Sequence, residues 1–188
     1  CMGCRPLQGR EICLSIPSVG ATENAMLAAC GCQGKTVITG AAREPEIVDL
    51  QDFLRKTGVH ITGAGTSRIC IQGGVSQDRV EHTVIGDRMA GATYLCAAAA
   101  AGGSIELTGL EPEHLACVLA VLEEAGCRIT QEKDQIPLHS SGQLHGVRPV
   151  RTAPYPGFPT DAQAVLMAAL AGGEGSPMFV ENIFASRY

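Results

Sequence analysis

Residues 87–126 read DRMAGATYLCAAAAAGGSIELTGLEPEHLACVLAVLEEAG, and their pattern occurs three times in the chain. A polar start leads into a run of small residues, a glycine, an apolar stretch, a Glu-Pro-Glu loop and a helical stretch that ends at another glycine. Residues 18–58 repeat it as SVGATENAMLAACGCQGKTVITGAAREPEIVDLQDFLRKTG, and a third copy opens at 160–173 as TDAQAVLMAALAGG. Pro45 and Pro112 mark the same point in two copies, so the period is roughly 70 residues, longer than that of solenoid repeats. The pattern therefore predicts small α/β units.

The first copy predicts the order of elements within a unit. Proline marks strand ends because it cannot donate to a ladder, and small polar residues mark helix starts. The expected elements are a strand at 12–16, a helix at 21–30 capped by Ser18, a strand at 35–39, a helix at 45–56, and two strands joined by a hairpin turn at 63–66. Each unit is expected to run β-α-β-α-β-β in an α/β or α+β domain.

The second copy predicts a buried helix face made by Leu115, Leu119 and Leu122. After it, residues 140–154 are expected to form a strand and a loop. The proline-rich turn at 155–159 then leads into the third helix.

Composition narrows the classes of function. The chain has 188 residues, 45% of them hydrophobic and only 4% aromatic, which suits a globular core packed through small side chains. A net charge of −5 argues against nucleic acid as a partner, because neutralising phosphates needs a basic face. No apolar run is long enough for a membrane span, so we expect no membrane partner.

Nine cysteines raise the question of metal or disulfide chemistry. Cys1 and Cys4 have C-x-x-C spacing, but no second pair follows at zinc-ribbon distance. We interpret the cysteines as free, small hydrophobes of a reducing cytoplasm. His139 and His145 lie without a carboxylate or cysteine at a supporting spacing, so we expect neither a metal site nor a cofactor.

The polar turns that open the first helix of each copy are the candidate functional sites. A helix N-terminus presents unpaired N–H groups and partial positive charge, which suit phosphate. The first turn offers Ser18 and a nearby glycine, the second Asp87 and Arg88, and the third Thr160 and Asp161. The same residue types are ordinary N-caps, so plain capping remains the alternative.

Asp161 is the candidate catalytic residue. It follows a turn framed by Pro156 and Pro159, whose stiffness places one side chain accurately. A carboxylate held in this way can take a proton from a substrate hydroxyl.

Five motifs resemble those of the bacterial UDP-N-acetylglucosamine 1-carboxyvinyltransferases, also called UDP-N-acetylglucosamine enolpyruvyl transferases. In chain order they are PSVGATEN at 17–24, AAREPEIVDL at 41–50, GAGT at 63–66, DR at 87–88 and RTAPYPGFPTD at 151–161. The resemblance covers nearly the whole chain. The shikimate-pathway enolpyruvyl transferases share the fold but not these motifs.

The resemblance implies an inside-out α/β barrel built from β-α-β-α-β-β units in two domains. It also implies transfer of the enolpyruvyl group from phosphoenolpyruvate to the 3-hydroxyl of UDP-N-acetylglucosamine, with release of phosphate. This is the first committed step of peptidoglycan synthesis, in the cytoplasm. The two substrates are the implied partners, and the oligomeric state stays open.

The resemblance also implies roles for single residues. The residue matching Asp161 binds the sugar and is the family's proposed base, the one matching Ile183 contacts the UDP-sugar, and Arg88 is expected near the interdomain cleft. The nucleotide-site turn corresponds to Ile16, Pro17, Ser18, Val19 and Gly20.

The chain also departs from the family. Family members are roughly twice as long, so we expect an internal piece. Residues 1–85 are expected to be the C-terminal part of the UDP-sugar-side domain, and 86–188 part of the catalytic-side domain. We expect this piece alone to be inactive, because neither Cys1 nor Cys4 matches the family's acid-acting cysteine.

Two substitutions fall near the expected site. Ile16 stands where the family usually has lysine, and the family's Glu-Asn-Arg reads Ala-Ser-Arg at 185–187. They leave a second hypothesis open, a non-catalytic paralogue that binds a UDP-sugar or pairs with a full-length partner. Transfer of enolpyruvyl to another acceptor is a third.

Overall fold

The computed structural model describes residues 7–74, 79–130 and 133–184. The chain divides into two compact units between Val84 and Ile85. Cys1, Cys4 and the substitution at 185–187 lie outside the described residues. The assignment of two functional domains to 1–85 and 86–188 stays a prediction.

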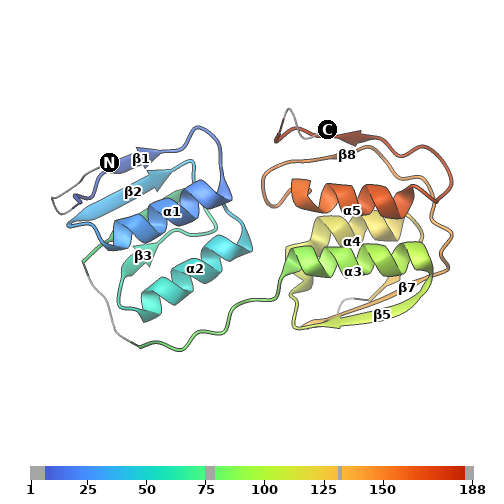
Figure 1. Ribbon diagram of the computed structural model, residues 1–188, viewed down its shortest axis with the longest axis horizontal. Coiled ribbons are helices and arrows are strands. Elements are labelled where there is room, and N and C mark those ends of the chain that lie inside the picture. Colours follow the sequence, from blue (N-terminus) through green and yellow to red (C-terminus); the bar gives the residue numbers. More distant parts are fainter. Residues whose placement is uncertain (1–6, 75–78, 131–132, 185–188) are drawn as a thin grey trace. The chain divides into compact units, whose positions relative to one another are not determined.

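The first unit contains one full copy of the repeat (Figure 1). Its elements are β1 (Glu11–Cys13), α1 (Val19–Cys30), β2 (Lys35–Thr39), α2 (Pro45–Lys56), β3 (His60–Thr62) and β4 (Arg68–Gln72). The sheet order is β1-β2-β4-β3, with β1 parallel to β2 and with β4 antiparallel to both of its neighbours. The expected β-α-β-α-β-β order is confirmed in this unit.

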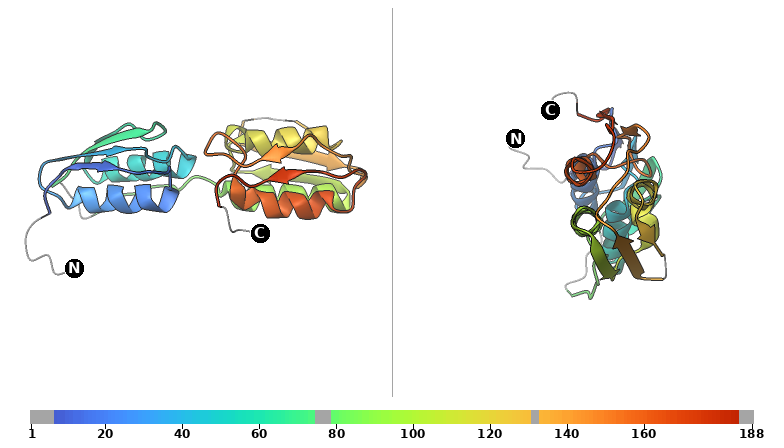
Figure 2. Two further views of the ribbon diagram at one scale, coloured as in Figure 1. Left: turned by 90° about the horizontal axis from the view of Figure 1, so that it is seen from above. Right: turned by 90° about the vertical axis from the view of Figure 1, so that its right-hand side faces the viewer.

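Alternation along the strands fixes the buried face of this sheet. Ile38 of β2 and Ile69 and Ile71 of β4 are buried, and they form one cluster with Met26 of α1 and Ile47 of α2. Helices α1 and α2 are neighbours and cover this face (Figure 2).

The second unit contains parts of two further copies. Its elements are α3 (Arg88–Ala101), β5 (Gly103–Thr108), the 3-10 helix η1 (Pro112–Leu115), α4 (Ala116–Glu124), β6 (Arg128–Ile129), β7 (Gln135–Ser140), β8 (Val150–Arg151), α5 (Thr160–Leu170) and β9 (Phe179–Val180). The sheet order β5-β7-β6 repeats β2-β4-β3 in pairing direction as well as in order. The parallel strands β8 and β9 flank α5 as β1 and β2 flank α1.

The second copy departs from the expected order, because no strand precedes α3 within the described residues 79–87. Nζ of Lys56 donates to the carbonyl of Glu81 at 3.1 Å, and Nε2 of His82 lies 2.9 Å from Oδ1 of Asp49. These contacts hold residues 81–82 on α2 of the first unit.

One expected strand is shifted: the strand expected at 12–16 is β1, which runs from Glu11 to Cys13. The strand and loop expected within 140–154 are present, with β8 as the strand. The preceding strand β7, which ends at Ser140, was not predicted. Sequence reasoning missed β7 because Pro137 lies inside it and cannot donate to the ladder. Its carbonyl still accepts the N–H of Thr130 at 3.1 Å.

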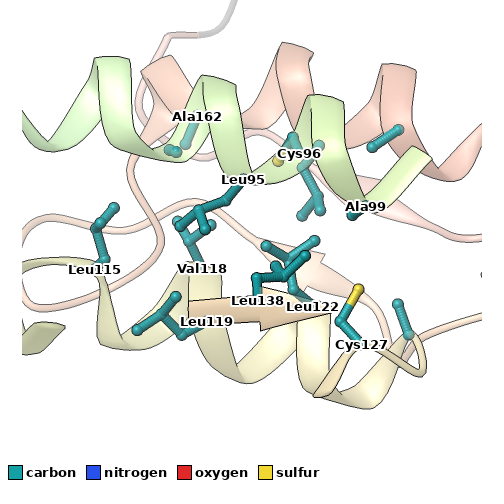
Figure 3. Packing of buried hydrophobic residues seen from close by; sticks show 14 of the residues in the cluster. Leu95, Cys96, Ala99, Leu115, Val118, Leu119, Leu122, Cys127, Leu138 and Ala162 are labelled. Atoms are coloured by element: carbon teal, nitrogen blue, oxygen red, sulfur yellow. The ribbon is translucent and has the colours of Figure 1, made fainter. Parts of the chain in front are cut away.

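The core of the second unit lies between α3, α4 and the sheet (Figure 3). Leu115, Leu119 and Leu122 are fully buried, which confirms the predicted face of the helical stretch. Figure 3 shows Leu95 of α3 pointing toward this face and Leu138 of β7 lying behind it.

Small residues let α3 approach its neighbours closely. Ala92 and Ala99 are fully buried, and a Cβ added to Gly91 would lie only 2.6 Å from Cδ1 of Leu110. Helix α3 packs along α5 on the same side of the unit (Figure 1). The Ala- and Gly-rich composition therefore serves close helix packing.

Two of the three polar helix starts are N-caps. Oγ of Ser18 accepts the N–H of Ala21 at 3.3 Å, and Oδ1 of Asp87 accepts those of Met89 and Ala90 at 2.8 and 3.0 Å. The capping alternative is therefore confirmed for both residues. None of the described helices combines the length and the apolar character needed to cross a bilayer.

Replacing Leu119 by Ala should lower the free energy of unfolding of the second unit by about 2–5 kcal/mol, because it leaves a cavity in a fully packed site. Urea denaturation measures the loss. Tyr94→Ala on α3, at a side chain that is 62% exposed, is the matched control and should stay within about 0.5 kcal/mol of the parent. Equal losses for both variants would contradict this core.

Asp87→Ala should cost about 1 kcal/mol, because it removes the acceptor for two N–H groups of the first turn of α3. Asp87→Asn keeps that acceptor oxygen and should restore most of the stability. The same denaturation experiment compares them, and an Asn variant as unstable as the Ala variant would show that the charge, and not the cap, matters.

Candidate functional site

The first candidate turn, residues 16–20, lies on the surface of the first unit. Ile16 is 63% exposed, Pro17 and Gly20 are exposed, and Ser18 and Val19 are half-buried. A Cβ added to Gly20 meets no atom within 4 Å, and its φ lies outside the left-handed region. The fold itself therefore does not require glycine at this position.

A buried threonine holds this turn in place. Oγ1 of Thr22 donates to the carbonyl of Ser18 at 2.8 Å and accepts the N–H of Ala42 at 3.0 Å. Thr22 is fully buried, so the two hydrogen bonds form in an environment without competing water. They fix the turn against the loop that precedes α2.

Arg88 is the second candidate residue and is only 8% exposed. Its guanidinium carbon lies 5.6 Å from the centre of the Tyr155 ring, within the range of a cation–π contact. Burial raises the pKa of the Cys117 thiol, and the nearby charge of Arg88 opposes that rise. Arg88 is thus a buried cation at the start of α3.

Asp161 is exposed and lies in the first turn of α5. The N-cap residue is Pro159, which makes no side-chain capping hydrogen bond, so this helix start differs from those at Ser18 and Asp87. The preceding turn is anchored by buried Phe158, whose carbonyl accepts the N–H of Ala153 at 3.1 Å. That the stiffness of this turn places Asp161 stays a prediction.

The contact between Arg88 and Tyr155 brings the starts of α3 and α5 to the same part of the second unit. Tyr155 opens the turn that delivers Asp161 to α5. Ser18 belongs to the other unit, and convergence of all three turns on one site stays a prediction. So do the binding roles expected for residues 16–20.

Sequence reasoning missed one residue of this region, Glu181. Its Oε2 accepts the hydroxyl of Thr160 at 2.7 Å, and its Oε1 accepts that of Thr152 at 3.0 Å. Oε1 also accepts the N–H groups of Ile183 at 2.7 Å and Phe184 at 3.0 Å. A glutamate after a two-residue strand carries no motif of its own, and its partners lie up to 29 positions away.

Partial burial of the Glu181 carboxylate opposes its ionisation, but the hydrogen bonds outweigh this effect and lower its pKa from 4.5 to about 2. The largest of these contributions comes from Thr160, followed by the N–H groups of Phe184 and Ile183 and by Thr152. The carboxylate is therefore ionised at neutral pH. Ile183, the residue expected to contact the UDP-sugar, is half-buried and held by this charge.

The described residues contain no group of three or more His, Cys, Asp or Glu side chains placed to hold a metal ion. Nδ1 of His139 lies 2.9 Å from the hydroxyl of Ser104. Cys96 and Cys127 are buried free thiols, and burial raises the pKa of Cys96 to about 12. Cys13 is exposed, so not every cysteine is the buried hydrophobe that we expected.

The family model for EPSP synthase (3-phosphoshikimate 1-carboxyvinyltransferase) matches residues 2–188. The UDP-N-acetylglucosamine 1-carboxyvinyltransferase of Gluconacetobacter diazotrophicus is 46% identical over 98% of the chain, which covers 44% of that relative. UDP-N-acetylglucosamine 1-carboxyvinyltransferase 1 of Symbiobacterium thermophilum is 48% identical over 98% of the chain, which covers 42% of that relative.

Solved structures support the same fold. The enolpyruvyl transferase NikO from Streptomyces tendae superposes with a TM-score of 0.82 at 24% identity, over 98% of this chain and 46% of that one. An EPSP synthase from Acinetobacter baumannii superposes with a TM-score of 0.60 at 21% identity. The match covers 93% of this chain and 40% of that one.

The chain thus spans less than half the length of the curated relatives that it matches. The match of the family model runs through both units and includes all three candidate turns. On this evidence the chain belongs to the EPSP synthase (3-phosphoshikimate 1-carboxyvinyltransferase) family of enolpyruvyl transferases, and its relatives include UDP-N-acetylglucosamine 1-carboxyvinyltransferases.

Proposed function

We propose that this chain is part of an enzyme that transfers the enolpyruvyl group of phosphoenolpyruvate to the 3-hydroxyl of UDP-N-acetylglucosamine. The observation that carries the proposal is the identity of 46–48% to enzymes named for this reaction, over 98% of the chain. Such an enzyme acts in peptidoglycan synthesis in the cytoplasm, and hence in cell-wall formation and cell division.

In this proposal Asp161 is the general base. Its carboxylate takes the proton of the 3-hydroxyl while the sugar oxygen attacks C2 of phosphoenolpyruvate, whose methylene carbon gains a proton. The resulting tetrahedral intermediate then loses inorganic phosphate, and a proton leaves the methyl carbon to restore the enol double bond. The exposed position of Asp161 in the first turn of α5 supports this role, because a base must be reachable by the substrate.

Residues 16–20 bind the nucleotide part in the same proposal. The helix start offers N–H groups and partial positive charge to the diphosphate, and Gly20 leaves open space for its approach. The buried cation Arg88 contributes positive potential near the reacting groups.

A second candidate function is binding of the UDP-sugar without catalysis. Ile16 favours it, because an exposed apolar side chain stands where the related enzymes usually carry a lysine. Loss of that charge weakens attraction to a diphosphate without removing the neutral part of the site.

The isolated chain should bind UDP-N-acetylglucosamine but release no phosphate from phosphoenolpyruvate in its presence, an outcome that the second candidate function shares. Binding is expected because the proposed sugar and nucleotide residues are all in the chain, and isothermal titration calorimetry measures it. A phosphate-release assay on the same sample measures turnover. Turnover by the chain alone would contradict our expectation that it lacks catalytic groups, and failure to bind would contradict the proposed site.

Gly20→Ala separates a ligand-binding role from a structural one. The added methyl group meets no protein atom within 4 Å and suits a helix, so the melting temperature should stay the same or rise. If the backbone at Gly20 touches the ligand, affinity for UDP-N-acetylglucosamine should fall about tenfold.

Gly31→Ala at the other end of α1 is the matched control, because a Cβ there meets only Ala28 O at an ordinary 3.7 Å. It should leave the affinity unchanged. Unchanged affinity in Gly20→Ala as well would remove this turn from the proposed nucleotide site.

A further inference from the structure

Glu181 connects its own loop to two other segments of the chain. Thr152 follows β8, Thr160 begins α5, and residues 183–184 follow β9. One carboxylate oxygen takes the bond from Thr160, and the other takes those from Thr152, Ile183 and Phe184, all between 2.7 and 3.0 Å. Both oxygens are therefore engaged: one holds the start of α5, and the other holds Thr152 and residues 183–184.

Asn182 adds two more hydrogen bonds between the loop after β9 and Thr152. Its N–H donates to Oγ1 of Thr152 at 2.8 Å, and its Nδ2 donates to the carbonyl of Thr152 at 3.1 Å. Thr152 is 1% exposed, so these bonds lie out of reach of solvent at that end. The loop after β9 is thus fastened to β8 and, through Glu181, to α5.

The two residues given substrate roles above are each one step from this carboxylate. Asp161 follows Thr160 directly in the chain, and Ile183 donates its own N–H to Glu181. Loss of Glu181 removes a hydrogen bond beside each of these two residues, so we expect the base to move relative to the UDP-sugar contact.

We propose that Glu181 is a positioning residue, which sets the distance between Asp161 and Ile183 so that one sugar nucleotide reaches both. The inference rests on the proposed function, because it concerns the acceptor of that reaction. Proton transfer requires a base within hydrogen-bond reach of the hydroxyl, and a small displacement of the base lowers the reaction rate strongly. The ionised Glu181 carboxylate accepts four hydrogen bonds, and hydrogen bonds to a charged group are strong enough to hold the residues around it in place.

Two substitutions test the proposal at different points of the connection. Glu181→Ala removes all four bonds, whereas Thr160→Val removes only the hydroxyl that links Glu181 to α5 and keeps the shape of the side chain. Glu124→Gln is the matched control, because Glu124 is also a carboxylate of the second unit that accepts N–H groups, here from Arg148 at 2.6–3.2 Å. Thr160→Val keeps the test decisive if Glu181→Ala fails to fold.

Hydrogen exchange of the free chain gives the first readout. Amides of 183–184 should exchange about tenfold faster in Glu181→Ala, the order expected for losing a hydrogen bond to a charged group. In Thr160→Val, amides at the start of α5 should lose protection while those of 183–184 keep most of theirs. Unchanged exchange at both places would overturn the proposal.

Affinity for UDP-N-acetylglucosamine, measured by calorimetry, gives the second readout. Glu181→Ala and Thr160→Val should each weaken binding about tenfold, and Glu124→Gln should not. In an Asp161→Asn background Thr160→Val should have little further effect, because Thr160 links Glu181 only to the helix start that carries Asp161. Additive losses would show a general structural role and overturn the proposal.

The two readouts separate this proposal from the proposed function. If the unsubstituted chain does not bind UDP-N-acetylglucosamine, the proposed function loses its support. Exchange in the free chain then decides alone whether Glu181 couples the start of α5 to Ile183.

The pH dependence of exchange provides a readout that a neutral packing role would not produce. The pKa of Glu181 is lowered from 4.5 to about 2 in the folded chain, so its stabilising effect is complete above pH 4.5 and lost as the pH falls toward 2. Protection of Ile183, corrected for intrinsic exchange, should be flat from pH 7 to 4.5 and should fall below that. The other charged groups on the joined segments are Asp161 and Arg151. A flat profile down to pH 2 would contradict the role of the ionised carboxylate.

Discussion

Burial of one sheet face under closely packed helices is the constraint from which the rest of this structure follows. In the first unit, alternate residues of β2 and β4 point into the core from this face. In the second unit, the leucines of η1 and α4 pack in the core. Small side chains such as Gly91 and Ala99 let the helices sit close to what they cover. Because each helix is locked against its sheet, its first turn has a fixed place, and that is where the polar residues lie.

The three helix starts share this origin but differ in chemistry. Ser18 and Asp87 are used as caps, so their side-chain oxygens serve the helix itself. The start of α5 is organised differently: its N-cap residue is a proline, and the hydroxyl of Thr160 goes to Glu181. The carboxylate proposed as the base thus lies on a helix start whose own hydroxyl makes a tertiary contact and not a cap.

Local signals predicted much of the fold. The strand at Lys35–Thr39 and the helix at Pro45–Lys56 were predicted to the residue, because proline at the first helical position and alternation in the strand are strong markers. The strand containing Pro137 could not be predicted in this way. Its pairing with β5 and β6 outweighs the missing N–H, and that pairing is a tertiary effect.

The candidate site also contains residues that the local sequence predicts and residues that depend on tertiary contacts. Ser18, Asp87, Arg88 and Asp161 stand at helix starts that the repeat makes visible in the sequence. Glu181 is absent from any local pattern, since its role depends on the approach of β8 and α5 in three dimensions. The packing of Arg88 on Tyr155, from segments that are separate in sequence, was likewise beyond sequence reasoning.

The central claim is that the start of α5 receives the acceptor sugar, and a crystal structure of the chain with UDP-N-acetylglucosamine tests it most directly. The measurement is the distance from the Asp161 carboxylate to the 3-hydroxyl of the sugar. We predict a separation of about 2.6–3.2 Å, the reach of a general base. A bound sugar whose 3-hydroxyl lies far from Asp161, with the nucleotide away from residues 16–20, would contradict the account.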